Sequence, residues 1–269
     1  MKILSRTYMW LVFALLYAPI LVLVVFSFNE GGSLSNYTGF SFRWYGELFR
    51  DSVALQSLKN SLLLALGSAT IATVIGTFAA LGLDRMKSRA VKGAISSVTN
   101  IPMMNPDIVT GVSMMLLFVA LGGILQLDNV LGRWTMLIAH VTFSLPYVIL
   151  SILPRFRQFD NTLREAALDL GCTPMRSFFK VELPAILPGV ISGFVMGFTL
   201  SLDDFVISHF VSSPDFQTLP LYIYNQTAHD VKYSMYALCT LIIVTILVLL
   251  LAVNFAGGIG KGKRKEGVK

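Results

Sequence analysis

This chain has few charged residues, few histidines and few cysteines, and each shortage excludes a class of protein. Only 13% of its 269 residues are charged, whereas 55% are hydrophobic. Because an average soluble domain carries about 25% charged residues, the composition excludes a soluble globular protein and indicates a membrane protein with several spans. We attribute the net charge of +6 to loops at a membrane surface rather than to nucleic-acid binding.

The residue types that carry enzyme chemistry are scattered. The histidines His140, His209 and His229 lack the spacing of metal ligands, so we expect no metal site. Cys172 and Cys239 are expected at different depths, so we expect no disulfide. The chain contains no Gly-x-Ser-x-Gly motif, and we assign no catalytic residue.

A nucleotide-binding loop is also missing. Residues 257–263 have a suggestive spacing of glycine and lysine, but Arg264 stands where such a loop needs a magnesium-binding hydroxyl residue. The segment also follows an apolar run instead of a strand. We therefore expect no cofactor in this chain.

Long apolar runs are what the chain has in abundance. Six of them approach or exceed the roughly 20 residues that cross a bilayer: about 8–28, 59–83, 101–121, 134–153, 185–207 and 234–256. The sequence thus predicts an all-α membrane protein with six transmembrane helices in one domain, 1–269. The first run lacks a small-residue cleavage site before Asn29, so we expect a retained signal anchor.

The positions of lysine and arginine predict the orientation. If the N-terminus is inside, the inner segments hold two, four, five and five of the 21 basic residues, and the outer segments hold three, one and one. This asymmetry favours cytoplasmic termini and a cytoplasmic loop over 154–184.

That loop contains signals for two short helices. Thr162 and Glu165 have the spacing of a capping box, which predicts a helix start. Gly171 suits the left-handed turn that ends a helix, and Thr173-Pro174 suits the start of the next one. The sequence predicts helix, glycine elbow, helix.

The first short helix is expected to carry a small apolar docking face, formed by Leu163, Ala166, Ala167 and Leu170. The loop resembles the EAA loop of ABC importer permeases, which it matches at Glu165, Ala166, Ala167, Gly171, Leu183, Pro184 and Pro188. The alternative is an ordinary helix hairpin in which Glu165 only caps.

The resemblance implies a type I, MetI-like permease fold whose core is spans two to six, in the bacterial inner membrane. It implies that the chain docks on an ATP-binding subunit through Glu165, Ala166, Ala167, Gly171 and Pro174. The implied partners are a homologous permease subunit, two ATP-binding subunits that hold ATP and magnesium, and a periplasmic solute-binding protein. The chain itself would not be an enzyme.

Carboxylates within apolar runs are costly, and they usually line a pathway or pair with a partner. Asp203 and Asp204 fall in the outer half of the fifth span. Ser201, Asp204 and Ser208 share a helical stripe, so Asp204 is the first candidate for the pathway and Asp203 the second. The alternative role is a cap or an interhelical pair.

Asp107 is the third candidate, nearer the cytoplasmic end of its span. Pro102 and Pro106 precede it and predict a broken or delayed helix start beside a cavity. In the fifth span, Gly189, Gly193 and Gly197 recur every four residues, which predicts close helix packing.

Carboxylates along a pathway suit a cationic substrate. Residues 140–143, 199–206 and 219–224 resemble the spermidine/putrescine importer permeases, so we expect transport of polyamines. Another solute, such as a metal ion, an anion or a different organic cation, stays open. A secondary transporter should show repeat symmetry or paired charges, and a membrane enzyme should show a catalytic cluster; we find neither.

Overall fold

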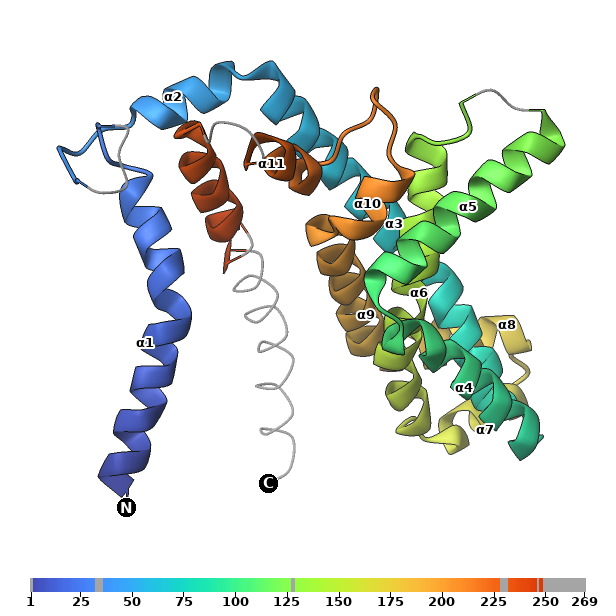
Figure 1. Cartoon of the computed structure of the whole chain (residues 1–269). Coiled ribbons are helices and arrows are strands. Elements are labelled where there is room, and N and C mark those ends of the chain that lie inside the picture. Colours follow the sequence, from blue (N-terminus) through green and yellow to red (C-terminus); the bar gives the residue numbers. More distant parts are fainter. Residues whose placement is uncertain (1, 32–35, 127–128, 228–231, 246, 249–269) are drawn as a thin grey trace. The chain divides into compact units, whose positions relative to one another are not determined.

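The computed structural model describes residues 2–31, 36–126, 129–227, 232–245 and 247–248, and its regular elements are helices (Figure 1). In chain order they are α1 (Lys2–Phe26), α2 (Arg43–Arg50), α3 (Ser52–Arg85), α4 (Arg89–Met104), α5 (Asp107–Leu125), α6 (Arg133–Arg157), α7 (Asn161–Asp169), α8 (Pro174–Ser177), the π-helix η1 (Phe178–Glu182), α9 (Leu183–Asp203), α10 (Val206–Val211) and α11 (Leu219–Thr227). A further apolar helix covers Ser234–Thr245. Among these residues, strand-like pairing is limited to two isolated bridges.

In the part of the chain that the structure describes, five helical segments are long and apolar enough to cross a membrane: Arg6–Phe26, Ser52–Arg85, Asp107–Leu125, Arg133–Arg157 and the continuous stretch Pro174–Asp203. They correspond to the first five predicted spans. The predicted sixth span, 234–256, begins with the helix Ser234–Thr245, and its end lies outside the described residues.

The chain divides into two compact units. The larger unit, Ser57–Tyr222, contains both candidate sites; the smaller consists of Met1–Gln56 and Ile223–Lys269. In the smaller unit, Asn29 holds the segment after α1: its Oδ1 accepts from the Thr38 amide at 2.9 Å, and its carbonyl accepts from the Trp44 indole at 2.6 Å.

Within the larger unit, α6 and α9 lie side by side (Figure 1). The three glycines of α9 are buried against α6, as their spacing predicted. A Cβ at Gly193 would stand 3.3 Å from Ile152 and Val148, and one at Gly197 would stand 3.2 Å from Val148. The stripe therefore serves close packing within this chain.

Gly193→Leu should destabilise the larger unit, because a side chain at this position overlaps two aliphatic residues of α6. Overpacking of this kind costs about 1–3 kcal/mol. Thermal unfolding of the detergent-solubilised protein measures the effect. Gly82→Leu is the matched control, because nothing lies within 4 Å of a Cβ there; equal melting temperatures for the two variants would contradict the packing role.

The predicted third span, 101–121, begins too early. α4 ends at Met104, Asn105 is extended with ψ 141°, and the membrane-length helix α5 starts only at Asp107. Pro106 causes the break, because a residue before proline is forced out of the helical region and proline donates no amide. The predicted delay in the helix start is thus confirmed, and the span shifts to Asp107–Leu125.

The predicted fifth span, 185–207, is wrong at its end. α9 stops at Asp203, Asp204 is extended with ψ 122°, and the chain resumes a helix at Val206. The carboxylate of Asp204 binds the amides of Ile207 and Ser208, so it caps a new helix and ends the old one.

Candidate functional site

The first candidate site is the elbow segment, residues 158–182, which connects α6 to α9. Its first helix, α7, is capped by Asp160, whose Oδ1 accepts from the Thr162 amide at 3.0 Å and from the Thr162 hydroxyl at 2.8 Å. The predicted capping box of Thr162 and Glu165 is therefore wrong. The Thr162 hydroxyl donates to a stronger acceptor two residues earlier, and these bonds lower the pKa of the Asp160 carboxyl.

Gly171 forms the predicted elbow. Its φ is +86°, a left-handed conformation that favours glycine. Its amide donates to Leu168 O at 2.9 Å and the Cys172 amide donates to Ala167 O at 3.0 Å, which is the Schellman pattern of a helix end. Thr173 then caps α8 and Pro174 takes the first helical position, as predicted.

Of the four residues of the predicted docking face of α7, three are exposed and one is buried, and the docking itself stays a prediction. Leu163 and Leu170 are 54% and 86% exposed, and Ala166 and Glu165 are also exposed. Ala167 is 8% exposed and packs inward, so it belongs to the chain's own interior. The exposed face consists of Leu163, Ala166 and Leu170, one helical turn apart in each step, with Glu165 beside it.

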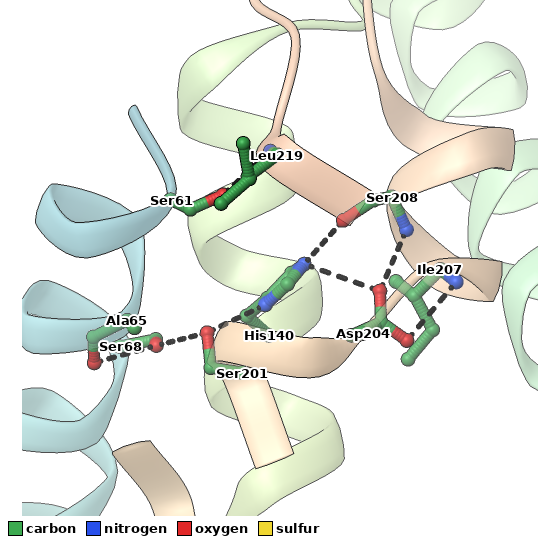
Figure 2. Close-up of polar contacts among 9 residues, drawn as sticks. All are labelled: Ser61, Ala65, Ser68, His140, Ser201, Asp204, Ile207, Ser208 and Leu219. Atoms are coloured by element: carbon green, nitrogen blue, oxygen red, sulfur yellow. Dashed lines mark hydrogen bonds and ion pairs between the residues drawn. The ribbon is translucent and has the colours of Figure 1, made fainter. Parts of the chain in front are cut away.

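The second candidate site is a polar cluster around the helix break after α9, made by Ser68, His140, Ser201, Asp204 and Ser208 (Figure 2). His140 of α6 stands at its centre and is fully buried. Its Nδ1 lies 2.7 Å from Ser201 Oγ, and its Nε2 lies 3.2 Å from Ser208 Oγ and 3.6 Å from Asp204 Oδ2.

The cluster joins α3, α6 and both sides of the break. Ser68 of α3 lies 2.9 Å from Ser201 Oγ (Figure 2). A neutral imidazole with its proton on Nε2 satisfies the contacts, because Ser201 then donates to Nδ1 while Ser208 and Asp204 face a donor. Since buried polar groups are costly without partners, a complete network of this kind holds the break in one geometry.

Asp204 is turned into the chain. Its side chain is 6% exposed, and its oxygens accept from the Ser208 amide at 2.8 Å and the Ile207 amide at 3.3 Å. Ser201, Asp204 and Ser208 do come together, but across a helix break and not along one continuous helix. The predicted role of Asp204 in a pathway stays a prediction.

Asp203 and Asp107 are exposed in this chain. α5, which Asp107 begins, packs against α10, and a Cβ at Gly111 would stand 2.9 Å from Phe210. Two exposed carboxylates therefore belong to the helices on either side of this region, Asp107 at the start of α5 and Asp203 at the end of α9.

The sequence analysis missed the role of His140, because we examined the histidines only as metal ligands. A titratable side chain within an apolar run was itself the available signal. Within the described part of the chain, no three His, Cys, Asp or Glu side chains gather as a metal ion would require.

The long apolar helices, with an elbow of two short helices between α6 and α9, place the chain among α-helical membrane proteins with the type I importer permease fold. The chain belongs to the family described as binding-protein-dependent transport system inner membrane component, which matches residues 72–257. It is therefore a membrane component of a transport system.

Two relatives from Escherichia coli K12 are similar over most of their length. The putrescine transport system permease protein PotI is 42% identical over 86% of this chain and 82% of its own. The spermidine/putrescine transport system permease protein PotC is 39% identical over 93% of this chain and 92% of its own.

A crystal structure of a bacterial alginate ABC transporter, in complex with an alginate pentasaccharide-bound periplasmic protein, has a subunit with a similar fold. The TM-score is 0.73 at 18% identity, over 99% of this chain and 95% of that one. At this identity the likeness concerns the fold alone.

Proposed function

We propose that this chain is a transmembrane permease subunit of an ATP-driven importer that carries putrescine and spermidine across the bacterial inner membrane. The observation that carries the proposal is its similarity, at 42% and 39% identity, to permeases of putrescine and spermidine/putrescine systems over most of the chain. The distribution of lysine and arginine supports cytoplasmic termini and a cytoplasmic elbow segment.

The proposed assembly contains a homologous permease subunit, two ATP-binding subunits and a periplasmic solute-binding protein. The exposed face of α7 supports the docking of an ATP-binding subunit, with Glu165, Ala166, Gly171 and Pro174 at the contact or shaping it. Ala167 would support the helix from beneath. ATP binding would close the ATP-binding subunits, and the elbow segment would carry that motion into α9.

The proposed substrate pathway passes the helix break. Asp107 and Asp203 are exposed carboxylates that can attract the ammonium groups of a polyamine. Asp204 contributes through the geometry of the break, because its oxygens are bound by amides of α10. An anionic substrate would be repelled by the same groups.

Uptake of radiolabelled putrescine and spermidine into proteoliposomes tests this function. The vesicles would hold the complete complex with ATP inside and the solute-binding protein outside. We expect uptake of both polyamines only with ATP. Uptake of a metal ion or an anion instead would overturn the substrate but keep the importer. Uptake driven by an ion gradient without ATP would overturn the importer and favour a secondary transporter.

A further inference from the structure

Glu182 is a buried carboxylate at the end of the elbow segment, and it is not one of the residues at which the segment matches the EAA loop. It is the last residue of η1, immediately before α9, and its side chain is only 3% exposed. Arg85 Nη2, at the end of α3, donates to both carboxylate oxygens of Glu182 at 2.6 and 2.9 Å. Arg164 Nε, on α7, lies 3.6 Å from Glu182 Oε1.

The Glu182 carboxylate contacts arginines on two helices, α3 and α7, and its backbone leads directly into a third, α9. Arg85 ends the membrane-length helix α3, Glu182 leads into α9, and Arg164 belongs to the short helix that presents the exposed face of the elbow segment. Arg85–Glu182 joins elements that are 97 residues apart, whereas Arg164–Glu182 joins α7 to η1 within the elbow segment. A carboxylate at this burial needs its partners, because an unpaired charge is strongly unfavourable there.

The two pairs differ in tightness. The Arg85 contact has the distances of a strong, charge-assisted hydrogen bond, whereas Arg164 at 3.6 Å is held mainly by charge. Both arginines are about one third exposed. The Arg85 contact therefore holds Glu182 to the end of α3, and the Arg164 contact is a looser link from the same carboxylate to α7.

The backbone at Glu182 is also unusual. Phe178–Glu182 form a π-helix between α8 and α9. π-helical turns are rare and are frequent at functional sites, since each one disturbs the regular hydrogen-bonding of the surrounding helix. Here the π-helical turn ends at Glu182, whose carboxylate contacts both Arg85 and Arg164.

We propose that Glu182 is a positioning residue that, through Arg164, transmits movement of α7 to the adjoining ends of α3 and α9. The proposal rests on the proposed function, because it takes α7 as the helix on which an ATP-binding subunit acts. Movement of α7 would then reach α9 by two routes: along the peptide chain through Gly171, and through the charged contact between Arg164 and Glu182. Without the Arg164–Glu182 contact, the ATP-binding subunits still dock and hydrolyse ATP, but fewer cycles move the spans.

Arg164→Gln tests the transmission, because it removes one charge and leaves Glu182 paired with Arg85. The measurement is the number of ATP molecules hydrolysed per polyamine imported, in proteoliposomes that hold the complete complex. We expect this ratio to rise at least fivefold, with unchanged co-purification of the ATP-binding subunits. Arg164→Lys, which keeps the charge and a similar reach, should return the ratio to within about twofold of wild type.

Arg157→Gln is the matched control, since Arg157 is an exposed arginine at the end of α6, beside the elbow segment. Its ratio should equal the wild-type ratio. A wild-type ratio for Arg164→Gln would overturn the proposal, and loss of co-purification would overturn it in favour of a direct docking contact. If the wild-type complex imports another solute with ATP, the ratio is measured with that solute; if no ATP-driven uptake occurs, both this proposal and the proposed function fall.

Discussion

Gly171→Val is expected to lower ATP-driven uptake more than tenfold while the chain still inserts and assembles. Gly171 has φ +86°, where a β-branched residue is strained by about 1–3 kcal/mol. Relief of that strain would rotate the chain between α7 and α8 and break the bonds from the amides of Gly171 and Cys172 that close α7. The exposed face of α7 would then be presented at a different angle.

The cause can be isolated, because nothing lies within 4 Å of a Cβ at Gly171. A side chain there meets no neighbour in this chain, so within this chain the effect comes from the backbone conformation. Gly171→Asn is the matched variant, since asparagine tolerates the left-handed region, and it should keep most of the uptake. Uptake and ATP hydrolysis are measured together in proteoliposomes. Wild-type coupling in Gly171→Val would contradict a role for the elbow in transport.

The elbow could be predicted from the sequence because its signals are local. Gly171 ends a helix and Thr173-Pro174 begins one, and each acts on backbone groups within a few residues. The wrong capping box shows the limit of this reasoning. Asp160 and Thr162 can each cap a helix start. In the structure Asp160 caps α7, and the Thr162 hydroxyl donates to the Asp160 carboxylate.

The polar cluster and the Glu182 pairs could not be predicted in this way. His140 and Ser201 are 61 residues apart, and Arg85 and Glu182 are 97 residues apart. Which of these residues meet depends on how α3, α6 and α9 pack against one another. The hydropathy of the sequence predicts the helices but not their packing. The break at Asp204 was missed for a related reason: an apolar run predicts where a helix crosses the membrane, while a buried cap decides where it stops.

Asp204→Asn is expected to lower uptake at least tenfold and also to lower thermal stability. The aspartate offers an oxygen to each of two amides, Ile207 N and Ser208 N, and it stands beside His140 Nε2. Asparagine has one oxygen, so its NH2 group must face a donor. A buried donor without an acceptor costs about 1–3 kcal/mol. The hydrogen bonds that cap α10 would weaken, and the backbone at the break between α9 and α10 would no longer be held in one conformation.

Asp203→Asn and Asp107→Asn separate this effect from attraction of the substrate. Both carboxylates are exposed, so their replacement should leave the melting temperature of the solubilised complex near the wild-type value. If they attract the ammonium groups, each variant should still lose uptake several-fold, and the double variant should lose more. Uptake that falls only in Asp204→Asn would limit the function of this site to holding the helix break. Wild-type uptake and melting temperature in Asp204→Asn would instead show that the break does not depend on the charge, because an amide would then serve the same two backbone donors.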